Sequence, residues 1–390
     1  MFDFTPDETT RLLLDTVRRF VRTELVPLEE EVERDGALAP ERAAEIFARS
    51  RALGLYAMNM PDELGGGGLN AVQICLVEEQ FGHTKDILIR RAFGNAYEVL
   101  LECRGEQRER WLAPVVRGER VCSIAITEPD AGSDAAAIRT RATPHGEGWR
   151  LNGAKHFVSD GLFSDFFVVS AVTDADAGRR GISLFLVDKT TDGVRVGRDQ
   201  PMMGLAGTSH VELFFDDVAL GPECLLGERG RGLALIYTTL GRVRLAHIGA
   251  RALGLSRRLL DAMAGYANER RQFGQPIGEF QLVQQMLADS AMEIASARLL
   301  MLHTAWRIDR GEPAREGISM VKVQASETLG RVADRAVQIF GGAGYCKDQP
   351  IERIYRDARI FRIYDGTSEI HRGVVARGLL AQGVESILPE

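Results

Sequence analysis

The chain has few cysteines, and they form no pattern that would bind a metal or build a disulfide framework. Only five occur in 390 residues, and none of them form a CxxC pair. Scattered thiols in odd number are typical of a reducing compartment. The seven histidines also lack the spacing of metal ligands. The sequence therefore predicts a cytoplasmic protein without a metal site.

Further absences narrow the class of protein. No run reaches the roughly 18 apolar residues of a membrane span, and the N-terminus has acidic residues and no apolar signal core. A net charge of −7 gives no basic field for nucleic acid or acidic lipid. No GxGxxG follows a strand pattern, and the glycine-rich loop 61–68 lacks the Lys-Ser/Thr ending of a phosphate loop. We therefore expect no membrane or nucleic-acid partner, no Rossmann domain and no triphosphate site.

What remains is the composition of a globular protein with three stretches of different character. Hydrophobic residues make up 45% and charged residues 26%. Residues 1–121 show helical periodicity, 122–231 hold short β-rich runs, and 232–390 return to long helices with one apolar side. This order predicts an α+β multidomain fold, with an N-terminal helical domain, a small middle β-sandwich or barrel, and a C-terminal four-helix bundle.

Local signals predict some element boundaries. Thr5 to Glu8 fits a capping box, with Thr5 as the helix cap, and Pro27 is expected to end or kink that helix. The Asn152-Gly153 pair lies between two alternating runs, which is a strong hairpin signal. A β-hairpin turning at residues 152–153 is therefore expected in the middle domain.

One carboxylate near the C-terminus occupies an informative position. Asp365 directly precedes Gly366, and the hydroxyl pair Thr367-Ser368 can cap a following helix. A carboxylate on such a junction can face a cavity, whereas one inside a helix usually faces water. A plain helix-to-helix turn is the alternative, and taken alone the pattern favours it.

Two segments of the middle domain could approach a flat ring system. The loop with Ile126, Thr127 and Ser133 offers hydroxyls and exposed backbone N–H groups, although an ordinary polar loop has the same composition. Phe157 and Ser159 point the same way on a strand, which places an aromatic wall beside a hydroxyl. A core phenylalanine with a satisfied serine is the alternative.

Two segments of the last stretch could also hold a ligand. Arg270 with Phe273 and Gln281 could bind a pyrophosphate or adenine, but an arginine and a glycine also suit a helix C-terminus. Gln338 precedes Gly341 and Gly342, where glycines let the backbone approach a ligand or simply end a helix.

Taken in order, these segments resemble the acyl-CoA dehydrogenase family from Phe4 to about Leu380. The matching motifs, quoted as they stand, are Pro61–Gly66, Thr127-Glu128-Pro129-x-Ala131-Gly132-Ser133-Asp134, Asn152-Gly153-x-Lys155, Gly204-x-x-Gly207-Thr208-Ser209, Arg270-x-x-Phe273-Gly274-Gln275-Pro276-Ile277, Phe340-Gly341-Gly342-x-Gly344-Tyr345 and Tyr364-x-Gly366-Thr367-Ser368-Glu369-Ile370. One motif would be weak evidence, whereas seven in register are specific.

The resemblance implies an enzyme with FAD between the β domain and the C-terminal bundle. Its implied cofactor-binding residues are Ile126, Thr127, Ser133, Phe157, Ser159, Arg270, Phe273, Gln281, Thr367 and Glu369, joined by Gln338, Gly341 and Gly342 from a neighbouring subunit. Its implied substrate-binding residues are Ser133, Arg244, Asp365 and Gly366. Phe157 stands where the family usually has tryptophan, and Ser159 where it usually has threonine.

Asp365 stands where the family usually has its glutamate base. The implied reaction removes the α-proton of an acyl thioester while the β-hydrogen leaves as hydride to flavin N5. Some branches of the family carry the base on the helix after the hinge, but residues 240–245 contain no carboxylate. Aspartate at this position occurs in family members that act on alicyclic acyl-CoAs and in nitroalkane oxidases, which favours a compact, branched or cyclic acyl group.

The resemblance also implies partners, and it leaves alternative functions open. Acyl-CoA is the implied substrate, an electron-transfer flavoprotein the implied acceptor, and a homotetramer the implied assembly. The rivals are a flavin oxidase or monooxygenase on the same fold, an acyl-ACP dehydrogenase, and a non-catalytic homologue that binds flavin or a partner.

Overall fold

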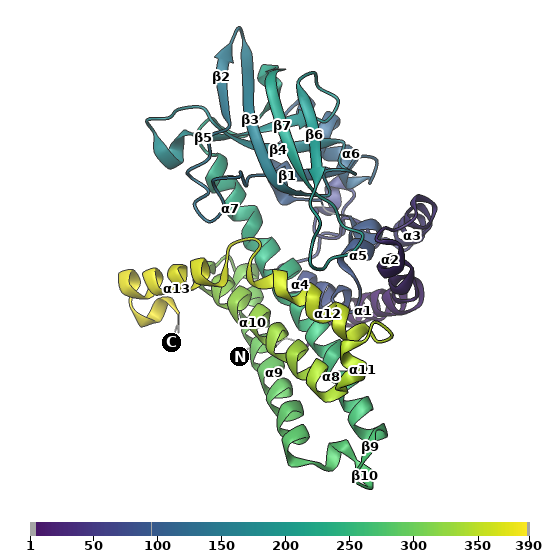
Figure 1. The fold of residues 1–390 in the computed structure, drawn as a ribbon. Helices are drawn as coiled ribbons and strands as arrows, with labels where there is room; N and C mark the ends of the chain where they lie inside the picture. The colour runs from purple at the N-terminus through teal and green to yellow at the C-terminus, as the bar shows by residue number, and fades with distance from the viewer. Residues whose placement is uncertain (1–4, 95, 388–390) are drawn as a thin grey trace.

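The computed structural model describes residues 5–94 and 96–387, and it shows a β domain standing on a large helical assembly (Figure 1). The α-helices are α1 (Glu8–Phe20), α2 (Glu29–Asp35), α3 (Pro40–Ala52), α4 (Ala71–Phe81), α5 (Asp86–Phe93), α6 (Ala113–Val116), α7 (Gly232–Val243), α8 (Arg251–Glu269), α9 (Gln281–Asp309), α10 (Arg315–Phe340), α11 (Gly342–Tyr345), α12 (Pro350–Ala358) and α13 (Ser368–Gln382). The strands are β1 (Cys122–Ala125), β2 (Arg141–His145), β3 (Gly148–Ser159), β4 (Phe166–Val172), β5 (Ile182–Asp188), β6 (Val194–Asp199), β7 (His210–Leu220), β8 (Leu225–Leu226), β9 (Arg271–Gln272) and β10 (Gln275–Pro276).

The first helix starts later than its capping pattern predicts. Asp7 is the cap, because its Oδ1 accepts the backbone N–H of Thr10 at 2.7 Å, so the expectation for Thr5 is wrong. An acidic side chain next to the first turn also suits the positive end of the helix dipole. The kink expected at Pro27 is present, because a π-helical turn and a 3-10 turn separate α1 from α2.

The middle domain is one curled sheet of two halves. Its strand order is β6-β7-β3-β2-β4-β5-β8, and β1 pairs in parallel with β4. A single pair, Arg141 with Val172, joins β2 to β4, so the β6-β7-β3-β2 half and the half around β4 and β5 fold over a shared core. This arrangement confirms the small β domain expected from the sequence.

The hairpin expected at Asn152-Gly153 is wrong. The chain turns at Gly146, between the paired residues His145 and Gly148, and β3 then runs without interruption through residues 152–153. Gly153 has φ +146°, and a Cβ there would lie 2.5 Å from the Thr140 hydroxyl. The glycine is therefore needed for a bulge and for the close approach of the backbone to Thr140. In the sequence, a glycine needed for either reason looks the same as a glycine in a turn.

The N-terminal and C-terminal helices share one hydrophobic core, although the β domain separates them in sequence. This core includes Leu14 of α1, Leu76 of α4, Leu253 of α8, Met301 of α9 and Val332 of α10. Helices α4 and α8 meet at glycines: a Cβ on Gly254 would lie 1.9 Å from the Glu79 carbonyl oxygen. Helices α8, α9 and α10 pack together, and α12 and α13 lie across α10 (Figure 1).

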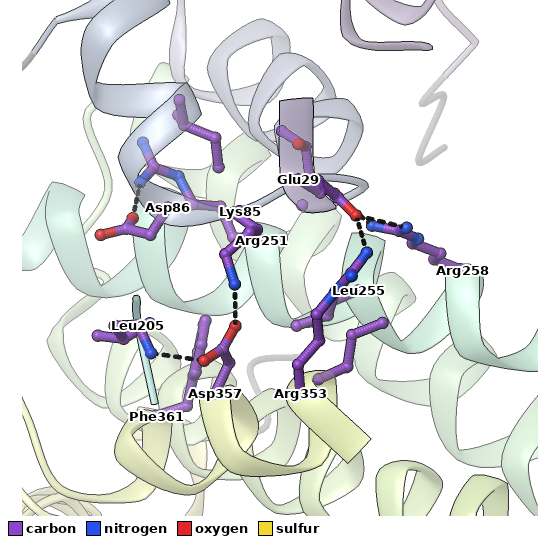
Figure 2. A pocket seen from close by; sticks show the side chains of 14 residues that line it. Glu29, Lys85, Asp86, Leu205, Arg251, Leu255, Arg258, Arg353, Asp357 and Phe361 are labelled. Carbon is purple, nitrogen blue, oxygen red and sulfur yellow. Dashed lines mark hydrogen bonds and ion pairs between the residues drawn. The ribbon is translucent and has the colours of Figure 1, made fainter. Parts of the chain in front are cut away.

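A pocket lies between α2, α5, α8 and α12, and ion pairs line it (Figure 2). Glu29 accepts hydrogen bonds from both Arg258 and Arg353 at 2.6 Å. Asp357 accepts the backbone N–H of Leu205 at 2.5 Å and lies 3.8 Å from Lys85 Nζ. These contacts fix the 204–209 loop of the β domain against the C-terminal helices and so set the angle between the two parts.

Candidate active site

The turn that carries Asp365 lies between a 3-10 turn and α13, and its backbone is tightly held. Asp365 has φ +53° and Gly366 has φ +96°. The Asp365 carbonyl oxygen accepts a hydrogen bond from Arg244 Nε at 2.7 Å and lies 3.2 Å from His371 Nε2. A Cβ on Gly366 would lie 2.8 Å from that same nitrogen, so the histidine packs directly under the turn. Thr367 caps α13 by accepting the Ile370 N–H, as its sequence predicts.

The tautomer of His371 follows from its two partners. A carbonyl oxygen only accepts, so Nε2 must carry the proton that it shares with Asp365. Nδ1 is then an acceptor, and it lies 3.1 Å from the Ser319 hydroxyl of α10. Burial, together with the nearby Arg244, lowers the pKa of His371 to about 4, so the ring is neutral. Ser319, His371 and Arg244 therefore hold the turn without adding a titrating group near neutral pH.

The Asp365 carboxylate itself accepts no hydrogen bond from the described part of the chain. Burial raises its pKa above the usual 3.8, against the opposing attraction of Arg244, His247, Lys322 and Arg90. A half-buried carboxylate with a raised pKa and an unused pair of oxygens has the properties of a general base.

A chain of buried ion pairs runs past this base from the helices to the β domain. Arg251 binds Glu78 (2.5 Å) and Asp86 (3.0 Å). Arg90 binds Asp86 (2.5 Å) and also Asp160 (2.8 Å), the residue that follows Ser159 at the end of β3. Although burial raises the pKa of Glu78 and of Asp86, their basic partners outweigh it and lower both to about 2. Charges, rather than aliphatic side chains alone, therefore surround the space near Asp365.

The loop predicted to line a cofactor is positioned by a buried ion pair. Lys155 Nζ lies 2.8 Å from Glu128 and also donates to the carbonyl of Ile126 and the hydroxyl of Ser170. Glu128 in turn accepts the backbone N–H groups of residues 139 and 140. The loop that starts at Ile126 is thus held against β3, which explains why the glutamate and the lysine of the two motifs occur together.

The edge of this loop offers unused groups that suit a flat ring. Phe157 has φ +55°, is 51% exposed and stacks on His156 with ring centroids 3.9 Å apart. The hydroxyls of Thr127 and Ser159 accept and donate no hydrogen bond within the described residues, and the buried Nε2 of His156 has no partner there either. Val158 is buried between Phe157 and Ser159, but the positive φ of Phe157 and a register shift between Lys155 and Val158 interrupt the regular alternation of β3, so a shared side for Phe157 and Ser159 stays a prediction. An exposed aromatic ring beside unused polar groups fits a flavin.

The remaining predicted residues form a second cluster at the opposite end of the bundle. They are all exposed, and they comprise Arg270, Phe273 and Gln281 around the β9–β10 hairpin, and Gln338, Gly341 and Gly342 at the end of α10. Nineteen residues of α10 separate Gln338 from Ser319, which is about 28 Å at 1.5 Å per residue. Within one chain the structure therefore brings Asp365, Gly366, Thr367 and Arg244 together, but it does not bring the second cluster to them.

Two predicted residues lie at the margins of the first cluster. Ser133 is exposed on the 126–135 loop, and Glu369 is exposed in the first turn of α13. Sequence reasoning missed His371 and Ser319, which support the Asp365 turn, and also Lys322 and Arg90, whose charges act on the Asp365 carboxylate. The only signal for them in the sequence is polar residues at otherwise apolar helix positions, such as Lys322 within α10.

Comparison with known proteins agrees with this geometry. Family models match residues 7–119 (acyl-CoA dehydrogenase, N-terminal domain), 123–218 (middle domain) and 230–380 (C-terminal domain). The chain is 38% identical to the human mitochondrial short-chain specific acyl-CoA dehydrogenase, covering 96% of this chain and 90% of that protein.

Two solved structures extend the likeness to the fold and the cofactor. Butyryl-CoA dehydrogenase from Megasphaera elsdenii is 31% identical with a TM-score of 0.90, covering 97% of this chain and all of that one. The FAD complex of PigA is 27% identical with a TM-score of 0.88, covering 97% and 99%. The chain belongs to the acyl-CoA dehydrogenase family of FAD-dependent oxidoreductases.

Proposed function

We propose that this chain oxidises a compact acyl-CoA thioester to the α,β-enoyl thioester, with Asp365 as the base that takes the α-proton. The supporting observation is the clamped turn, which fixes the Asp365 backbone through its carbonyl and leaves the carboxylate oxygens unused. FAD, when bound, accepts the β-hydrogen as hydride. The two electrons of the α C–H bond remain and form the new carbon–carbon double bond.

The residues around the turn have separate roles in this proposal. Arg244 and His371 hold the Asp365 carbonyl, so the carboxylate is aimed by a rigid backbone. Thr367, Gly366 and the Glu369 N–H lie at the positive end of α13, which stabilises the negative charge that develops on the thioester oxygen. Thr127, Ser133, Phe157 and Ser159 would hold the flavin from the β-domain side.

A compact acyl group is supported by the size of the base and by its surroundings. Aspartate is one methylene shorter than glutamate, so its oxygens lie roughly 1.5 Å farther back, about one carbon–carbon bond. The substrate must therefore approach the turn closely. The ion pairs through Arg251 and Arg90 occupy the space beside the base, and a long alkyl chain would have to contact desolvated charges there.

Three further assignments complete the proposal. The carrier is CoA, with acyl carrier protein as the alternative, and an electron-transfer flavoprotein is the acceptor. The assembly is a homotetramer, which would bring the exposed cluster around Phe273 and Gly342 of one subunit to the flavin of another. The cytoplasmic location also stays a prediction. Among the described residues, no helix is both long and apolar enough to cross a bilayer.

Anaerobic titration of the FAD-loaded protein tests the proposal. Butyryl-CoA and a cyclic acyl-CoA should bleach the flavin, and palmitoyl-CoA should not. Asp365→Asn should slow bleaching at least about 1,000-fold, since the base is lost, while the flavin stays bound. Asp261→Asn, on the exposed side of α8, is the matched control and should behave as wild type. Turnover that survives in Asp365→Asn would show that another group is the base.

Reoxidation separates the dehydrogenase from an oxidase. After bleaching by butyryl-CoA, admission of oxygen should restore the flavin colour slowly, whereas an added electron-transfer flavoprotein should restore it fast. Fast recovery with oxygen alone would favour the oxidase.

A further inference from the structure

Lys322 is a fully buried lysine whose ammonium has no hydrogen-bond partner within the described residues. The other fully buried lysine, Lys155, behaves differently, because its ammonium contacts Glu128, Ile126 and Ser170. A buried charge without hydrogen bonds is costly and persists only where something compensates for it. We therefore expect a nearby anion to balance the charge of Lys322.

The helix face that carries Lys322 also carries the clamp of the catalytic turn. Ser319 lies one turn earlier on α10 and bonds His371, which contacts the Asp365 carbonyl. Residues three apart lie on the same helix face. Helix α10 packs against α13 and the π-helical segment Arg244–Ala250, and the bond from Ser319 to His371 turns this face of α10 toward the segment that carries Asp365.

Among the acidic groups near Lys322, Asp365 is the one that is partly buried and forms no ion pair within the described residues, although Arg244, His247 and Arg90 also attract it. Glu327 pairs with Arg362 and Arg372, and Glu369 is exposed to water. The Asp365 carboxylate accepts no hydrogen bond from the described residues. The titratable and charged groups that face this space from the surrounding elements are Arg90, Tyr97, Arg244, His247, Glu327, Tyr364, Glu369 and His371.

We propose that Lys322 is a positioning residue whose ammonium acts as the counter-charge of the Asp365 carboxylate, holding it ionised and turned toward the buried side until the substrate arrives. This inference rests on the proposed role of Asp365. The attraction is electrostatic, because no direct hydrogen bond joins the two groups. Lys322 touches no reacting atom, and it acts only through the base.

The electrostatics give the inference a direction in pH. Burial lowers the pKa of Lys322 to about 8, and the attraction of Asp365 opposes that decrease. Above pH 8 the ammonium of Lys322 loses its charge. It should then hold the Asp365 carboxylate less firmly, so the rate of flavin reduction should fall. Replacing the lysine by a neutral side chain should raise the Asp365 pKa, so that the base is protonated at a higher pH.

The experiment measures the rate of flavin reduction by saturating butyryl-CoA against pH in wild type, Lys322→Met and Lys322→Arg. In Lys322→Met the acid limb should move up by about one pH unit, the order expected for one charge at an effective dielectric of about 20. Its alkaline decline near pH 8 should disappear. Lys322→Arg should restore the acid limb. Arg331→Met, an exposed residue of the same helix that pairs with Glu293, is the control.

A second measurement needs no substrate. Thermal unfolding of Lys322→Met, Asp365→Asn and the double variant forms a cycle. The change in Tm caused by Lys322→Met should be more favourable in the Asp365→Asn background, because no anion then loses its counter-charge. Additive effects together with an unmoved acid limb would overturn the inference. Failure of butyryl-CoA to bleach any variant would contradict the proposed function instead. The thermal unfolding cycle would still show whether Lys322 and Asp365 interact.

Discussion

The two ends of the C-terminal bundle carry predicted site residues of opposite character. At the end near the β domain, Asp365 lies among buried groups, and Arg244 and His371 hold its backbone. At the far end Phe273 is 94% exposed and Tyr345 is 83% exposed. The groups at the first end contact one another within one chain, whereas the second end offers aromatic and glycine surfaces that no described residue covers.

This difference supports our proposal that a second subunit completes the cofactor site. Contiguous exposed apolar surface marks binding or interaction sites more often than single exposed side chains do. The far end has unused aromatic surface and an exposed arginine, Arg270, which suit a nucleotide from another subunit. Substitutions at the base end should therefore change rate and pH dependence, and those at the far end should change cofactor retention and assembly.

Among substitutions that leave Asp365 in place, the largest effect is expected at Arg244. Arg244→Met removes one of the two hydrogen bonds to the Asp365 carbonyl, which should let the base move by a fraction of an ångström. Flavin reduction by butyryl-CoA should slow by about 100-fold, since misplacement of a catalytic group by about 1 Å costs this much. FAD retention should be unchanged. Arg242→Met, two residues earlier and exposed, is the matched control. Equal slowing in both variants would contradict a specific clamp.

An acid titration should sharpen the comparison. Because the folded protein raises the Asp365 pKa, the carboxylate binds its proton at a pH above the usual 3.8. The reduction rate should then fall about tenfold per pH unit below the pKa, since only the ionised form is a base. Bound FAD, measured by filtration at each pH, should stay constant over this range. If the rate and the bound FAD fell together, unfolding of the protein, rather than protonation of Asp365, would explain the loss of rate at low pH.

The smallest effect is expected at the far end. Phe273→Ala removes a ring that is 94% exposed in the single chain, so folding of the subunit should change little. If another subunit covers the ring, FAD should dissociate roughly tenfold faster, as for loss of a modest interface contact. Light scattering and flavin release by gel filtration measure both quantities. Leu282→Ala, which is also exposed but lies on the first turn of α9, tests whether faster FAD release is specific to loss of the Phe273 ring. A tetramer with unchanged FAD release would place the cofactor elsewhere.

The periodicity of apolar residues predicted the long helices and strands well, because the buried face of each element repeats at the spacing of that element. Apolar residues recur at helical spacing through residues 280–308, which form α9 (Gln281–Asp309), and the β-rich run of residues 166–172 forms β4 with the same bounds. Turn signals were less reliable. Gly153 marks a bulge where β3 passes Thr140, and a bulge and a hairpin need the same permissive residue.

The carboxylate that we propose as the base could be singled out from sequence, because its neighbours Gly366 and Thr367 form a local turn and cap. His371 and Lys322 were missed, because each acts across helices that meet only in the folded chain. The sequence places Lys322 and Asp365 43 positions apart and gives no distance in space.

The sequence by itself determined the order of helical and β stretches, the family motifs and the aspartate at position 365, because each is local or written in a short segment. Only the tertiary structure decided that the first and last helices share one core, that a neutral histidine contacts the Asp365 turn, and that a buried lysine without a hydrogen bond is among the charges that act on Asp365. Those features depend on long-range packing, such as the approach of Gly254 to the Glu79 backbone, which no local pattern encodes.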